Sequence, residues 1–127
     1  MTDTLKGVFV NAAERTIVDI EIQRGVQPMY DMIGCRLVDL VVLPHSDDLF
    51  VDDEGLLSLT PTSPMFRIGT ATLAGNGIIL GGDDATGESC DVHRDAAYYR
   101  NVITFTHAAA DATMRMLRDA LNLDSDF

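Results

Sequence analysis

The stretch of residues 49–84 constrains the fold of this chain more than any other part of it. Two short apolar runs flank an acidic turn at residues 52–55, and a proline-containing connector and a glycine-rich run follow. We interpret the first half as a β-hairpin, with strands at residues 49–51 and 56–59 and with Gly55 supplying a positive φ in the turn. Short strands separated by turn residues are typical of antiparallel sheets.

Outside the hairpin of residues 49–59, strand patterns alternate with two helical patterns. Pro28 and Gly34 suit the first turn and the end of a short helix at residues 27–33. Residues 37–43 form a β-branched apolar run, which predicts a central strand buried on both faces. A helix-like turn is expected at residues 65–73. Further strands are expected at residues 6–10, 16–22, 77–80, 88–92 and 102–105, and a long helix at residues 107–121.

These elements predict one α+β domain over residues 1–127, in which only the tail 124–127 frays. Its core would be a mostly antiparallel sheet with a short N-terminal helix and a C-terminal helix packed on one face. With 46% apolar residues, a chain of this length can bury a core without a disulfide or a structural metal. Cys35 and Cys90 form no CxxC motif, and we expect two reduced thiols, with a single long-range disulfide as the alternative.

The charge balance excludes several classes of function. The chain carries 20 acidic residues against 9 lysines and arginines, which gives a net charge of −11. Duplex nucleic acid and anionic membranes are bound through clustered basic side chains, so we expect neither as a partner. The N-terminus lacks the basic and apolar regions of a signal peptide, and no apolar run approaches the length of a membrane helix. We therefore expect a soluble, cytoplasmic protein.

Two segments carry a resemblance to known proteins. They are Asp53-Glu54-Gly55-Leu56 and the glycine-flanked run of residues 73–81. Together they resemble a family of small single-domain proteins of unknown function that are frequent in bacteriophages and mobile elements of Gram-positive hosts. The likeness covers residues 37–92. It implies a phage or mobile-element origin, hence a host-cell cytoplasmic location if the protein is phage-encoded, and an accessory role; it implies no activity.

No metal or catalytic signature is complete. Counting back from Gly55, Phe50 stands where an EF-hand loop needs a carboxylate. His45, His93 and His107 have spacings that match no zinc motif. The glycines at residues 75–82 bracket a strand, whereas a phosphate-binding loop follows a strand and opens a helix. We therefore expect no metal, no cofactor and no enzymatic activity.

One segment brings cations and aromatic rings together. Arg94 and Arg100 flank the pair Tyr98-Tyr99, directly after His93. Arginine binds phosphate groups and aromatic rings stack on bases, so Arg94, Tyr98, Tyr99 and Arg100 are candidate ligand-binding residues. The alternative is a loop in which these arginines pair with nearby aspartates.

Two other groups are candidate protein contacts. The acidic turn residues Asp52, Asp53 and Glu54 are candidate contacts to a partner, although turn formation and protection of a sheet edge explain them equally. The C-terminal helix carries an apolar stripe that is wider than one packing face needs. It either packs on the sheet or forms a homo-oligomer, and the interface residues would be Met114, Met116, Leu117 and Leu121.

These observations favour a non-enzymatic, acidic accessory protein of phage or mobile-element type. It would bind a host or phage protein, of basic character, through shape and negative charge. The alternative function is a small-ligand protein that binds or sequesters a nucleotide-like signal and thereby has a counter-defence role.

Overall fold

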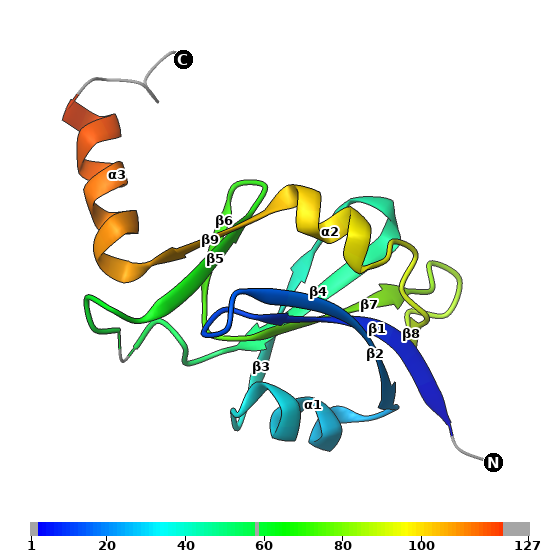
Figure 1. The fold of residues 1–127 in the computed structure, drawn as a ribbon. Coiled ribbons are helices and arrows are strands. Elements are labelled where there is room, and N and C mark those ends of the chain that lie inside the picture. Colours follow the sequence, from blue (N-terminus) through cyan, green and yellow to red (C-terminus); the bar gives the residue numbers. More distant parts are fainter. Residues whose placement is uncertain (1–2, 58, 121–127) are drawn as a thin grey trace.

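The computed structural model describes residues 3–57 and 59–120, which form two antiparallel sheets and three α-helices (Figure 1). The larger sheet consists of β2 (Thr16–Gln23), β1 (Thr4–Asn11), β7 (Gly77–Gly82), β4 (Asp47–Asp52) and β3 (Val38–Val42), in that order, with β8 (Ser89–Cys90) paired to the end of β7. The smaller sheet has the order β6 (Ala71–Ala74), β5 (Pro64–Ile68) and β9 (Ile103–His107). The α+β class with antiparallel sheets is confirmed.

The larger sheet is the middle layer of the molecule (Figure 1). Helix α1 (Val26–Ile33) covers one face, where Met29 and Ile33 pack against the apolar side chains of β1, β2 and β7. Helix α2 (Ala96–Val102) and the smaller sheet cover the other face, where Tyr99 and Phe66 join the main core. Alternating residues of each central strand therefore enter two different apolar clusters.

The sequence predicted α1 closely. The helix begins one residue before the expected start, has Pro28 in its first turn and ends at Gly34. Gly34 has φ 81°, a conformation that favours glycine, and its N–H donates to the carbonyl of Tyr30. No helix among the described residues is long and apolar enough to cross a membrane.

The prediction of a central strand at residues 37–43 was wrong. β3 is the outer strand of the larger sheet, and Leu40 and Val42 are exposed. The hairpin expected at residues 49–59 was also wrong, because β4 pairs with β3 on one side and β7 on the other. Residues 53–57 form turns instead of a return strand.

Residues 65–73 form β5, a turn and β6, so the expected helix-like turn is also wrong. β5 pairs with β6 on one side and with β9 on the other, which satisfies its backbone within the smaller sheet. Gly69 has φ 58° in the turn between β5 and β6, a position that favours glycine. The strand expected at residues 88–92 is reduced to β8.

The expected C-terminal helix is present as α3 (Ala108–Ala120), but it extends away from the sheets instead of lying across one of them (Figure 1). Its first turn is held because Asp111, which is buried, forms an ion pair with Arg67 of β5. The helix continues directly from β9, so the direction of that strand carries it outward. Met116 and Leu117 are exposed. Leu121 and the side chain of Met114 lie outside the described part of the chain.

Candidate functional site

A buried carboxylate organises the centre of the candidate site. Asp47, the first residue of β4, has no exposed surface. Its Oδ1 accepts hydrogen bonds from the backbone N–H of His93 at 2.8 Å and from Nδ1 of the same residue at 3.0 Å. Its Oδ2 accepts from the N–H of Arg94 at 3.2 Å and from the hydroxyl of Tyr99 at 2.5 Å. A buried carboxylate is stable only with such partners, so Asp47 fixes residues 93 and 94 in place.

The turn before β4 positions the carboxylate of Asp47. Residues 44–46 link β3 to β4, and His45 and Ser46 have φ values of 67° and 61°. Residues other than glycine rarely adopt such values, and the cost is of order 1 kcal/mol or more per residue. The result is that the carbonyl of Ser46 lies 3.1 Å from Nδ1 of His93.

The histidine at this site has a defined hydrogen-bonding state. Nδ1 of His93 faces two acceptors, Oδ1 of Asp47 and the carbonyl oxygen of Ser46. Neither acceptor can donate, so the proton lies on Nδ1 and Nε2 is the nitrogen available to a ligand. The side chain of His93 is 44% exposed although its partner is fully buried.

Tyr99 closes the site from the core side. Burial, followed by its hydrogen bond to Asp47, raises the pKa of the Tyr99 phenol well above its usual value. The phenol therefore stays protonated and keeps donating to Asp47.

The structure separates the four candidate ligand-binding residues. Arg94 and Tyr98 lie together, with the guanidinium carbon 5.4 Å from the ring centre. Tyr99 is only 1% exposed and lies behind them in the core. Arg100 points elsewhere and donates from Nε to the carbonyl of Ile17. His45, which the sequence did not place at this site, contacts both Arg94 and Tyr98.

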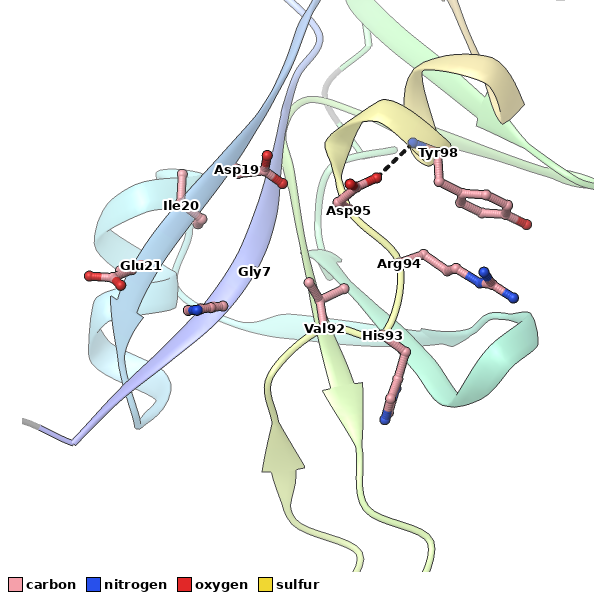
Figure 2. A pocket seen from close by; sticks show the side chains of 10 residues that line it. Gly7, Asp19, Ile20, Glu21, Val92, His93, Arg94, Asp95 and Tyr98 are labelled. Atoms are coloured by element: carbon pink, nitrogen blue, oxygen red, sulfur yellow. Dashed lines mark hydrogen bonds between the residues drawn. The ribbon is translucent and has the colours of Figure 1, made fainter.

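A pocket of about 560 Å³ opens in front of this cluster, between β1, β2 and the segment leading into α2 (Figure 2). Figure 2 shows Arg94, from that segment, and Tyr98, from α2, extending in the same direction, away from Asp19 and Glu21, whereas His93 points downward. Two of the acids at the pocket, Asp19 and Asp95, already accept hydrogen bonds. Asp19 accepts from the N–H of Ala96. Asp95 caps α2 by accepting from the N–H of Tyr98. The main lining side chains are Lys6, Asp19, Glu21, His93, Arg94 and Tyr98.

The acidic turn has a clear local role. Oδ1 of Asp52 accepts from the N–H of Glu54, and the carboxylate of Glu54 forms an ion pair with Arg36 at 3.0 Å. The N–H of Asp53 donates to the carbonyl of Leu37, which ties the turn to the start of β3. Asp52, Asp53 and Glu54 therefore lie beside the sheet edge formed by β3.

That edge is a second candidate site, and the sequence did not predict it. At one end of β3, the N–H of Leu43 donates to the carbonyl of Asp47. At the other end, the N–H of Asp53 donates to the carbonyl of Leu37. Odd-numbered residues of β3 thus face β4, since bonding positions alternate along an antiparallel strand. The backbone groups of residues 38, 40 and 42 consequently point outward. The exposed fractions of Leu40 and Val42 are 47% and 76%.

The cysteines and glycines are structural in this arrangement. Burial, together with nearby acids, raises the pKa values of Cys35 and Cys90, and both are free thiols. No group of three or more potential metal ligands occurs within the described ranges 3–57 and 59–120. Gly77 is explained by close packing, because a Cβ atom there would lie 2.8 Å from Leu49.

The comparison with protein families covers the whole body of the fold. A model described as "Domain of unknown function (DUF3846)" matches residues 5–104. The chain belongs to the DUF3846 family. This confirms the expected membership of a family of unknown function, while the phage or mobile-element origin stays a prediction. The matched range includes β3, the pocket and Asp47, and ends before α3.

One curated relative is an uncharacterized protein, y4iR, of Sinorhizobium fredii (strain NBRC 101917 / NGR234). It is 32% identical to this chain over 66 residues, which is 52% of this chain and 41% of the relative. The chain therefore spans less than half the length of the curated relative it matches. No solved structure matches this protein significantly.

Two signals in the sequence could have revealed more of these sites. Asp47 continues the period of two set by Leu49 and Val51, which places it on the buried face of β4. His93 and Arg94 precede Asp95, whose role as a helix cap anchors the start of α2. Neither pattern, however, indicates that the two segments meet, because they lie 46 residues apart.

Proposed function

We propose that this DUF3846 protein is a non-enzymatic binding protein that pairs with an extended, basic segment of a protein partner along the outer edge of β3. The observation that carries the proposal is the outward-facing backbone of residues 38, 40 and 42 next to exposed apolar side chains. An unpaired strand edge binds extended peptides through main-chain hydrogen bonds, and alternate side chains give specificity.

The side chains around β3 suit such a partner. Leu40 and Val42, whose exposed fractions are 47% and 76%, provide an apolar strip on one face of β3, and Leu37, which is 51% exposed, lies directly before the strand. The acidic turn that holds Asp53 and Glu54 borders this strip through the bond between Asp53 and Leu37. An apolar centre with a charged rim is typical of a protein interface, and here the rim attracts lysine and arginine.

A second copy of the chain fits this edge less well. Asp39 of β3 is exposed, and its Oδ1 accepts from the N–H of Leu40 at 2.8 Å, which occupies one outward donor. Charged side chains on an edge oppose pairing between identical strands, and each copy also carries a net charge of −11. A basic segment can instead form an ion pair with Asp39 and release that donor.

The test uses peptides of defined chemistry. A random-peptide display library is selected against the protein, and the selected peptides are synthesised and titrated by calorimetry. We expect sequences in which apolar residues alternate with lysine or arginine. Val42→Lys should weaken their binding at least about tenfold, because it adds a like charge and removes an apolar contact.

Val18→Lys is the matched control. Val18 is 40% exposed on β2, the strand at the opposite edge of the same sheet. This variant adds the same charge to the protein but leaves β3 unchanged, so binding should be retained. Selected peptides that bind Val42→Lys as well as the wild type, or that are acidic, would contradict the proposal.

An accessory role of phage or mobile-element type is part of this proposal. It is supported by the sequence resemblance over residues 37–92. The position of DUF3846 genes in bacterial genomes tests this role, since the proposal expects these genes to be enriched in prophages, plasmids and integrated elements. Members spread evenly among housekeeping operons would argue against it.

A further inference from the structure

The pocket in front of Asp47 contains one arginine, Arg94, that forms no ion pair with a carboxylate among the described residues. Three arginines form ion pairs with carboxylates within the described residues: Arg24, Arg36 and Arg67. The guanidinium of Arg94 forms none there, although the chain has 20 acidic residues; it contacts the rings of Tyr98 and His45. An arginine that lies at a pocket without a carboxylate partner is suited to an anionic ligand.

His93 adds a second polar group at the pocket. Its Nδ1–H is held by Asp47 and Ser46, so Nε2 is presented in one orientation. With the proton on Nδ1, Nε2 carries a lone pair and accepts a hydrogen bond from a hydroxyl or amino group of the ligand. The backbone N–H groups of both His93 and Arg94 are fixed on the carboxylate of Asp47, so their positions are set before a ligand arrives.

We propose that this pocket binds a small phosphorylated metabolite, with the phosphate on Arg94 and a hydroxyl or amino group of the ligand on Nε2 of His93. The site is independent of the β3 edge and does not rest on the function proposed above. Lys6 also lines the pocket and adds a further positive charge. The volume of about 560 Å³ suits a ligand of the size of a nucleotide or a sugar phosphate.

The acids at the other end of the pocket narrow the ligand class. Asp19 and Asp95 each use one oxygen on a backbone N–H of α2, and both residues line the pocket. The remaining carboxylate oxygens accept hydrogen bonds from hydroxyl or amino groups. The ligand therefore carries hydroxyl or amino donors besides its phosphate, which fits a ribose phosphate better than inorganic phosphate.

The first measurement is calorimetry with adenosine monophosphate, ribose 5-phosphate and inorganic phosphate. We expect saturable binding of at least one organic phosphate and at least about tenfold weaker binding of inorganic phosphate. Tighter binding of the nucleotide than of ribose 5-phosphate would assign a nucleoside phosphate, and equal binding would assign a sugar phosphate. Absence of saturable binding for all three probes up to about 10 mM overturns the proposal.

Two variants test the residues. Arg94→Gln should weaken binding of the organic phosphate at least about tenfold, since it removes a charge-assisted contact. Arg36→Gln makes the same change of charge outside the pocket, where Arg36 pairs with Glu54, and should change the affinity less than about twofold. Equal losses in both variants would reduce the effect to general electrostatics and overturn the assigned site.

His93→Asn separates ligand binding from folding. The asparagine amide can still donate to Asp47 in place of Nδ1–H, but it has no group in the position of Nε2. We expect an intact fold by circular dichroism and weaker ligand binding. If this variant unfolds, NMR of the histidine ring in the wild type decides: the proposal requires the His93 resonances to shift with the same saturation curve as the calorimetry, and unchanged resonances overturn it.

Discussion

Tyr99 donates its phenolic hydrogen to Oδ2 of Asp47 over 2.5 Å, at a position where 1% of the tyrosine and none of the aspartate is exposed. This bond links α2 to the first residue of β4, and the same carboxylate holds the segment that carries His93 and Arg94. The core and the pocket therefore share Asp47, and loss of the bond to Tyr99 should affect both the stability of the core and the geometry of the pocket.

The first prediction concerns the strength of that bond. Tyr99→Phe removes the hydroxyl and leaves Oδ2 of Asp47 with the N–H of Arg94 as its partner. We expect the free energy of unfolding to fall by about 1.5–3 kcal/mol, because the lost bond involves a buried charge. Urea denaturation followed by circular dichroism measures this. Tyr30→Phe, on the partly buried surface of α1, is the control and should change stability by less than about 0.5 kcal/mol.

The second prediction concerns alkaline pH. Burial and the bond to Asp47 raise the pKa of Tyr99 in the folded state, whereas an unfolded tyrosine titrates near about 10. As the pH rises above that value, the unfolded chain loses this proton first. The contribution of Tyr99 to stability is therefore complete below about pH 10 and declines above it by up to about 1.4 kcal/mol per pH unit.

Tyrosinate absorbance near about 295 nm gives a direct measurement of this effect. The chain has three tyrosines, and at pH near 11 the folded protein should show less tyrosinate than the same protein unfolded in denaturant. Tyr99→Phe should reduce that difference, because it removes the tyrosine whose pKa is raised in the folded state. A folded wild-type protein that ionises all of its tyrosines together at this pH would show that Tyr99 is not held as described.

The parts of the fold that the sequence predicted are those set by neighbouring residues. α1 is delimited by Pro28 and Gly34, whose effects on the backbone are local. β1 and β2 were expected from two apolar runs joined by a short polar connector, and their register pairs Val10 with Ile17 across it. In each case the information lies within a few residues of the element.

The parts that the sequence did not predict depend on distant partners. Residues 37–43 have the composition of a buried strand, yet whether a strand lies at the centre or edge is set by which strands pair beside it. β4 pairs with β7, which lies some thirty residues away along the chain, instead of forming the expected local hairpin with residues 56–59. Arg94 and Tyr98 were named from the sequence, but the role of Asp47 was missed for the same reason, because Asp47 is separated from Tyr99 by 52 residues.

The third prediction concerns the attachment of α3. Nε and one terminal nitrogen of Arg67 donate to Oδ1 of Asp111, at 3.2 and 3.0 Å, and the aspartate is buried. Asp111→Asn removes the charge but keeps a similar shape, so we expect the first turn of α3 to open more often. Hydrogen exchange of the α3 amides should become about tenfold faster or more, in keeping with the loss of one charged bond.

The exchange rates of the larger sheet provide the control for this variant. Amides of β1 and β7 lie far along the chain from Asp111 and should exchange as in the wild type if the change is local. Faster exchange throughout the protein would mean that α3 is part of the global folding unit. Unchanged exchange in α3 would show that the ion pair with Arg67 does not hold the helix.

The fourth prediction concerns association through α3. Met116 and Leu117 are 72% and 49% exposed on a helix that extends from the body, and apolar side chains of this kind are commonly covered by a second subunit. At a protein concentration of about 30 μM, we expect light scattering to report a mass above that of one chain. Met116→Glu should shift the protein to the monomer, because association would bury the new carboxylate.

Val26→Glu places the same charge on the exposed start of α1 and should leave the mass unchanged. A wild-type monomer, or an oligomer that survives Met116→Glu, would assign the exposed face of α3 a role other than self-association.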